Sequence, residues 1–156
     1  MKKAVITAFI LFFAGCFFAF GQNDKNISFN YGLEVNSYSP EGSLAGAAVL
    51  GFDINLPWLF AAGINLTACT DVEGNNAIEP TLLVRRYFFG QYTGFFVQVD
   101  FGIVIITAFE ETTIMYTGGV RCGYRFLFGN VFHVEPYIRA GYPFLAGVGV
   151  ILGLRY

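Results

Sequence analysis

The sequence predicts an all-β fold, an antiparallel up-and-down β-barrel of eight strands. Three observations support this prediction. Apolar residues recur at every second position in segments of about ten residues, turn residues separate these segments, and no stretch after the first 21 residues keeps an apolar period of 3.6. Because successive side chains of a strand point to opposite faces, each segment has one apolar face and one small or polar face.

The eight predicted strands cover residues 27–38, 44–54, 58–69, 78–88, 95–105, 114–128, 132–142 and 148–156. Turn signals separate them: Ser-Pro-Glu-Gly at 39–42, Asn-Leu-Pro at 55–57 and Gly-Asn at 129–130. We expect loops at 71–76 and 107–113 and a short turn at 90–93. The even number of strands and their length both fit a closed barrel that crosses a bilayer.

The first four segments separate two sets of side chains. Polar and small residues share a face with Glu34, Asp53, Asn65 and Arg85, and the neighbouring Arg86 points to the other side. The opposite face of these segments carries Ile27, Phe29, Tyr31, Leu33, Val35, Leu50, Phe52, Ile54, Phe60, Ile64 and Leu66.

The last four segments continue the pattern. Gln98, Asp100 and Gly102 lie opposite a row of Phe, Val and Ile in the fifth segment, and Arg121 and Arg125 lie opposite Tyr116, Val120, Cys122, Tyr124 and Phe126 in the sixth. In the seventh, His133, Glu135 and Arg139 oppose Val134, Pro136, Ile138 and Ala140. In the eighth, Gly149, Ile151, Gly153 and Arg155 oppose Val148, Val150, Leu152, Leu154 and Tyr156.

The apolar set must face outward, because the bore of an eight-stranded barrel only just accommodates side chains. The aromatic residues of that set would overfill it, whereas the small and polar set fits. An apolar exterior favours lipid over water, and a sheet in lipid must close to pair its edges. We therefore predict a transmembrane β-barrel.

Ten charged residues are predicted to face the bore, five acidic and five basic. Balanced charges can pair, so we expect them to form a hydrogen-bonded network that blocks a continuous channel. We expect Arg125 and Arg139 to flank Glu135, and Arg155 to lie near Glu135, whereas Arg86 faces outward and reaches lipid headgroups. The predicted network comprises Glu34, Asp53, Glu79, Arg85, Asp100, Arg121, Arg125, Glu135, Arg139 and Arg155.

The N-terminus is typical of a secretory signal peptide. Two lysines precede an apolar stretch from Ala4 to Phe20, and Ala19-Phe20-Gly21 gives a small-x-small site for cleavage before Gln22. The domains are then a signal peptide at 1–21 and a barrel at 22–156. The alternatives are an uncleaved membrane anchor and lipidation of Cys16, which follows Phe13-Ala14-Gly15 as in a relaxed lipobox.

Composition excludes several functions. Hydrophobic residues make up 55% of the chain and charged residues only 13%, and residues 22–156 keep seven basic residues against eleven acidic ones, so a basic surface for nucleic acid is not expected. No cofactor or metal is expected, because one histidine and the separated Cys69 and Cys122 form no ligand cluster or disulfide.

The two ends of the predicted barrel differ. Both chain termini are expected in the periplasm, and the loops that carry Glu41, Asp71, Glu73, Glu110 and Glu111 on the extracellular side. Aromatic rings are expected to form a girdle at the periplasmic rim, where membrane barrels place such rings. This girdle comprises Phe29, Phe52, Trp58, Phe60, Phe88, Phe95, Phe126, Phe132 and Tyr156.

Catalysis is not expected. A lipid-modifying enzyme would need a nucleophile activated by His133, and only Ser28 and Glu135 are candidates for the same end of the barrel. No motif surrounds Ser28. We therefore predict that the protein is not an enzyme.

The chain resembles the small eight-stranded bacterial outer-membrane barrels, the group of the outer-membrane protein A transmembrane domain and outer-membrane proteins X and W. The resemblance rests on the signal peptide, the strand count, the alternation and the ending Leu-Gly-Leu-Arg-Tyr at 152–156. It implies a location in the outer membrane of a Gram-negative-type envelope. It also implies contact with outer-membrane lipid and recognition by the barrel assembly machinery through Val150, Leu152, Leu154 and Tyr156.

Three functions follow as alternatives, and the subfamily stays open. The first is a non-enzymatic structural or surface-interaction protein with a plugged interior and an unknown surface partner. The second is a narrow, porin-like channel for small hydrophobic molecules, which resemblance to the W-type barrels implies. The third and most distant is a lipid-modifying enzyme.

Overall fold

The structure, a computed structural model, describes residues 26–38, 43–72, 74–90, 92–108 and 111–156. The expected signal peptide at 1–21, its cleavage after Gly21 and the alternative at Cys16 lie outside the described residues, as do Glu41, Glu73 and Glu110. No helix of sufficient length and apolar character to cross a bilayer occurs among the described residues.

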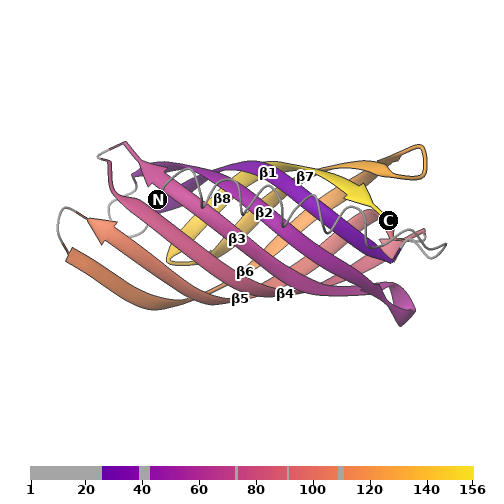
Figure 1. Ribbon diagram of the computed structural model, residues 1–156, viewed down its shortest axis with the longest axis horizontal. Helices are drawn as coiled ribbons and strands as arrows, with labels where there is room; N and C mark the ends of the chain where they lie inside the picture. Colours follow the sequence, from indigo (N-terminus) through magenta and orange to yellow (C-terminus); the bar gives the residue numbers. More distant parts are fainter. Residues whose placement is uncertain (1–25, 39–42, 73, 91, 109–110) are drawn as a thin grey trace, which may run out of the picture.

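Eight strands form one closed antiparallel barrel, as predicted (Figure 1). Each strand pairs with the next along the chain, and the eighth pairs with the first. The up-and-down order follows from the short connections between strands. The strands are β1 (Ile27–Tyr38), β2 (Leu44–Leu56), β3 (Phe60–Asp71), β4 (Asn76–Phe89), β5 (Thr93–Ala108), β6 (Glu111–Phe128), β7 (Phe132–Tyr142) and β8 (Phe144–Arg155).

Several predicted boundaries differ from the structure by two residues or more, including those at Trp58, at residues 107–113 and at the start of β8. Trp58 does not begin a strand, because it lies in the 3-10 turn η1 (Pro57–Leu59) with a φ of 63°, in the left-handed region. Residues 107–113 are not a loop throughout, since Thr107 pairs with Thr112 and Ala108 with Glu111. β8 begins at Phe144 rather than at 148.

The barrel has two distinct ends, which we call the terminal end and the loop end. At the terminal end, β1 begins beside the C-terminus, where the Tyr156 N–H donates to Ile27 O at 2.8 Å. β2, β4 and β6 end and β3, β5 and β7 begin at the same end, whereas β1, β3, β5 and β7 end and β2, β4, β6 and β8 begin at the loop end (Figure 1).

The exterior and the bore carry opposite chemistry, as the period of two predicted. Along β4, for example, Glu79 and Arg85 are buried in the bore, whereas Leu82 and Val84 expose 64% and 54% of their surface on the outside. The bore therefore holds most of the polar residues, and the exterior is a continuous apolar band. Its exposed members at mid-height include Leu33, Ile64, Leu82, Phe101, Val120, Ile138 and Val148.

Glycines on β8 let side chains of β7 pass over this strand and reach β1. His133 is level with Gly153, which is level with Asn30, and His133 Nε2 lies 2.9 Å from Asn30 Oδ1. Tyr137 crosses Gly149 in the same way. A Cβ on Gly153 would lie 2.1 Å from His133 Nε2, and a Cβ on Gly149 would lie 2.6 Å from Tyr137, so both positions require glycine. Contacts between β7 and β1 thus hold the closing strand in place.

Candidate functional site

Buried charge fills the middle of the bore. Of the ten charged residues expected there, nine have side chains that are at most 3% exposed, and each of the nine makes at least one ion pair with another. Arg155 is half-buried instead. The pairs divide into a terminal-side cluster and a loop-side cluster.

The terminal-side cluster is built around Glu135 on β7. Both of its carboxylate oxygens accept from Arg85 Nη1 at 3.0 Å, and Oε1 also accepts from Arg125 Nε. Arg125 Nη2 lies 3.7 Å from Asp53 Oδ2 on the opposite wall, and Asn30 Nδ2 donates to the same oxygen at 2.6 Å. Two acids and two arginines therefore balance in this cluster.

The expected contact between Arg139 and Glu135 is wrong, and Arg85 lies in that place instead. Glu135 and Arg139 both belong to β7 and lie four positions apart, which separates their Cα atoms by about 13 Å along the strand. Arg139 thus lies too far toward the loop end to share the carboxylate.

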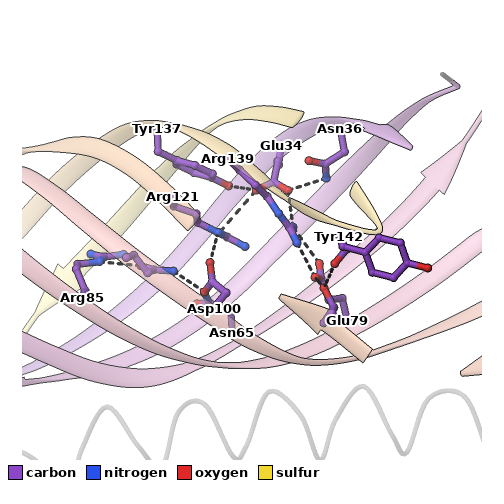
Figure 2. A network of polar contacts seen from close by, with 12 residues as sticks. Glu34, Asn36, Asn65, Glu79, Arg85, Asp100, Arg121, Tyr137, Arg139 and Tyr142 are labelled. Carbon is purple, nitrogen blue, oxygen red and sulfur yellow. Dashed lines mark hydrogen bonds and ion pairs between the residues drawn. The ribbon is translucent and has the colours of Figure 1, made fainter. Parts of the chain in front are cut away.

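The loop-side cluster is built around Glu34 on β1 (Figure 2). Glu34 Oε1 accepts from Arg139 Nη1 at 3.0 Å, and Oε2 lies 3.6 Å from Arg121 Nη1. Tyr137 Oη donates to Oε2 at 2.5 Å, and Asn36 Nδ2 donates to Oε1 at 2.6 Å. Because Arg121 and Arg139 are level neighbours on β6 and β7, the carboxylate between them offsets their repulsion.

Glu79 completes the loop-side cluster from β4. Arg139 Nη1 and Nη2 donate to its two oxygens at 2.9 and 2.5 Å, a bidentate arrangement that fixes both side chains. Thr117 Oγ1 lies 2.5 Å from Glu79 Oε1 and 2.9 Å from Tyr142 O, so its single proton is donated to one of these two acceptors at a time. With Asp100 beside Arg121 at 2.9 Å, this cluster holds three acids and two arginines.

Gln98 joins the two clusters into one network. Its Oε1 accepts from Arg85 Nε at 2.8 Å and its Nε2 donates to Asp100 Oδ1 at 2.7 Å. Most ion pairs join strands that are not neighbours in the barrel, namely β4 with β7, β1 with β6, β1 with β7 and β2 with β6. The side chains therefore cross the bore from wall to wall.

Two turn residues cover the bore at the terminal end. Leu59 and Tyr92 have φ values of 64° and 57°, a left-handed conformation that costs roughly 1–3 kcal/mol for a residue with a side chain. These conformations bring both side chains against an apolar group that includes Tyr87 and Phe96. Tyr92 Oη donates to Leu56 O at 2.7 Å, and the Arg155 guanidinium lies 5.4 Å from the Tyr92 ring centre.

Aromatic rings in the bore were not part of the predicted network, although they contact its arginines. The Arg85 guanidinium lies 4.3 Å from the Phe96 ring centre, and that of Arg125 lies 5.0 Å from the ring of Tyr87. The alternation of β4 and β5 could have found both rings, because Tyr87 shares a face with Arg85 and Phe96 shares one with Gln98. Nothing in the alternation marks Leu59 or Tyr92, since turns have no such period.

His133 lies within the polar network on the terminal side of the bore. His133 Nε2 lies 2.9 Å from Asn30 Oδ1 and 3.6 Å from Glu135 Oε1, and Glu135 is occupied by two arginines. The ring is fully buried, and so is Ser28. Among the described residues, no three His, Cys, Asp or Glu side chains are grouped to hold a metal ion, and Cys69 and Cys122 are free thiols.

The predicted girdle residues lie at the terminal end, eight of them at strand positions or the C-terminus and Trp58 in turn η1. Several rings touch across strands: Phe29 lies 5.2 Å from Phe52, and Phe88 lies 5.6 Å from Phe95. The outward Arg86 lies among them, with its guanidinium 4.9 Å from the centre of the Phe60 ring.

Comparison with known proteins concerns the fold. No protein-family model and no curated protein sequence matches this chain. Among solved structures, the N-terminal β-barrel domain of Pseudomonas aeruginosa OprF is similar, with 12% identity, a TM-score of 0.63 and coverage of 86% of this chain and 100% of that one.

Two further structures are similar. A de novo designed transmembrane β-barrel is 13% identical, with a TM-score of 0.56 and coverage of 86% and 98% of the two chains. Neisserial surface protein A is 11% identical, with a TM-score of 0.53 and coverage of 83% and 94%. The chain therefore has the closed eight-stranded barrel fold that these membrane proteins share.

Proposed function

We propose that this protein is an integral outer-membrane β-barrel whose bore is closed by its own side chains, and that it has a structural or surface-interaction role rather than a transport role. The single observation that carries the proposal is the network of nine buried charges that crosses the bore between opposite walls.

The apolar exterior supports the membrane location. Exposed leucine, isoleucine, valine and phenylalanine side chains surround the barrel at mid-height, whereas monomeric soluble proteins rarely expose apolar patches larger than a few hundred Å². The described charges outside the bore lie toward the ends of strands, as Arg86 does on β4 and Glu111 on β6. Such a surface suits lipid in the middle and water or headgroups at each end.

A closed bore supports a role other than conduction. In an eight-stranded barrel the interior is only just wide enough for side chains. Here the terminal end is covered by Leu59 and Tyr92, and ion pairs fill the middle. Opening a path for ions would require several paired charges to separate in a site with little water, which is strongly unfavourable.

Recognition by the barrel assembly machinery is part of the proposal. Val150 and Leu152 expose 45% and 44% of their surface on the outer face of β8, and Leu154 and Tyr156 continue that face at lower exposure. An assembly factor that binds this apolar row would bind the strand that closes the barrel against β1.

Conductance across a planar bilayer tests the closed bore. We expect no steady conductance from the purified barrel, and none from the Glu34→Gln or Arg121→Gln variants that remain folded. A steady conductance that changes when either charge is neutralised would contradict the closed bore and favour the narrow channel.

Two further measurements test the remaining alternatives. An outer-membrane fraction should contain the protein in a form that migrates differently on a gel before and after heating, and recovery from the soluble periplasm would contradict the membrane location. Expression should leave the mass of lipid A unchanged. A changed mass that reverts in the His133→Ala variant would support an enzyme instead.

A further inference from the structure

A cavity of about 150 Å³ lies at the loop end of the bore, beyond the ion-pair network. Strands β2, β3, β4, β5 and β8 contribute to its wall, and the side chains that form most of it are small or apolar. These are Ala45, Cys69, Ala77, Ile106 and Phe144. The cavity is partly open to solvent, and a wall that is mostly apolar favours small apolar molecules.

The polar residues of the cavity wall have hydrogen-bond partners within the β3–β4 turn and the strand ends beside it. Both Asp71 carboxylate oxygens accept at 2.8 Å from Asn75, one from its backbone N–H and one from Nδ2. Asn76 Nδ2 donates to Gly74 O at 3.2 Å, and Asn76 Oδ1 accepts from Thr70 at 2.9 Å. Because these groups satisfy each other, they favour an uncharged ligand over one that needs charge-assisted hydrogen bonds.

Phe144 connects the cavity to the network. Its ring is 2% exposed, lines the cavity and lies 5.3 Å from the Arg139 guanidinium carbon. Below this ring, Arg139 is fixed by Glu34 and Glu79. A molecule that entered from the loop end would therefore stop at Phe144.

We propose that this cavity binds one small, uncharged, apolar molecule of about the size of a single aromatic ring, and that the bound molecule leaves by the way it entered. The proposal goes beyond the proposed function, because the bore is closed with or without a ligand. It assigns the loop end a binding site that is separate from the ion pairs.

Toluene is a suitable probe, and Cys69 is a suitable reporter because it lines the cavity and is 4% exposed. Cys16→Ser and Cys122→Ser substitutions leave Cys69 as the sole thiol in a chain with three cysteines. We expect methyl methanethiosulfonate to modify Cys69 about tenfold more slowly when toluene is present at ten times its dissociation constant, because bound ligand occupies the approach. The midpoint of thermal unfolding should rise with toluene over the same concentrations.

Two matched variants separate the cavity from general effects of toluene on detergent or lipid. Ala77→Phe fills the cavity and should abolish the toluene dependence of both measurements. Ala68→Phe, one strand away on the exposed outer face of β3, should retain it. If Ala77→Phe does not fold, Ala45→Leu provides the filled cavity. No toluene effect in the parent protein, or an equal effect in the filled and control variants, would overturn the proposal.

Discussion

Neutralising Glu135 should destabilise the barrel more than any other single charge substitution in the terminal-side cluster. Its carboxylate accepts from Arg85 at 3.0 Å through both oxygens and from Arg125, and all three side chains are at most 2% exposed. Glu135→Gln keeps the shape but leaves two arginines facing Asp53 alone, so the cluster changes from neutral to one net positive charge. Breaking a buried ion pair on one side costs about 3–5 kcal/mol.

The assay is urea unfolding of the barrel in detergent micelles or vesicles, followed by circular dichroism. We expect the free energy of unfolding of Glu135→Gln to fall by about 3 kcal/mol. This is the lower end of the range, because the amide can still accept one hydrogen bond. Glu111→Gln is the matched control, since Glu111 is exposed at the loop end, and it should change stability by no more than about 0.5 kcal/mol.

A double variant isolates the pair itself. Arg85→Met combined with Glu135→Leu should lose less stability than the sum of the two single variants, with a coupling of about 1–3 kcal/mol. The reasoning is refuted if Glu135→Gln is as stable as Glu111→Gln, or if the single losses simply add.

Three further predictions concern other parts of the barrel. Gly153→Ala should lose about 1–3 kcal/mol in urea unfolding, because its new Cβ would lie 2.1 Å from His133 Nε2. Arg86→Gln should weaken binding of anionic phospholipid by about 1 kcal/mol in native mass spectrometry, because Arg86 is an exposed cation at the terminal rim. Tyr156→Ala should lower the amount of folded protein in the outer membrane, measured on unheated gels, while folding of the purified chain into detergent stays intact.

Each of these predictions has a control. Gly46→Ala should be close to neutral, because a Cβ at Gly46 would have no neighbour within 4 Å, and equal losses at both glycines would contradict the role of the crossing side chain. Arg86→Lys should retain phospholipid binding, and unchanged binding in Arg86→Gln would remove the headgroup contact. If Tyr156→Ala also fails to fold in detergent, the residue acts on stability rather than on recognition.

Much of the fold could be predicted because one rule, the alternation of side chains along a strand, acts on every residue of a barrel wall. It correctly directs Arg85 inward and the neighbouring Arg86 outward. The rule is weaker where a strand continues beyond the apolar band. Residues 107–113 carry mostly polar side chains, although Thr107 and Thr112 are β-branched and pair as strand residues do.

The partners of the buried charges could be predicted less well, because they depend on how far each strand is shifted along its neighbours. Alternation places Arg139 in the bore, but only the register shows that it lies level with Arg121 and within reach of Glu34 and Glu79. The cover at the terminal end also escaped prediction. Leu59 and Tyr92 enter the bore through left-handed turns, a conformation that the residue types themselves disfavour.

The glycines of β8 favour the native register of this strand against β7 and β1. A shift of β8 by two residues against β7 would place Ile151 beneath Tyr137 or His133, where glycine stands in the native register. The branched side chain would then occupy the space through which these residues reach β1. A two-residue shift of β8 therefore loses the contacts across the last seam, whereas the native alignment keeps a glycine level with both His133 and Tyr137.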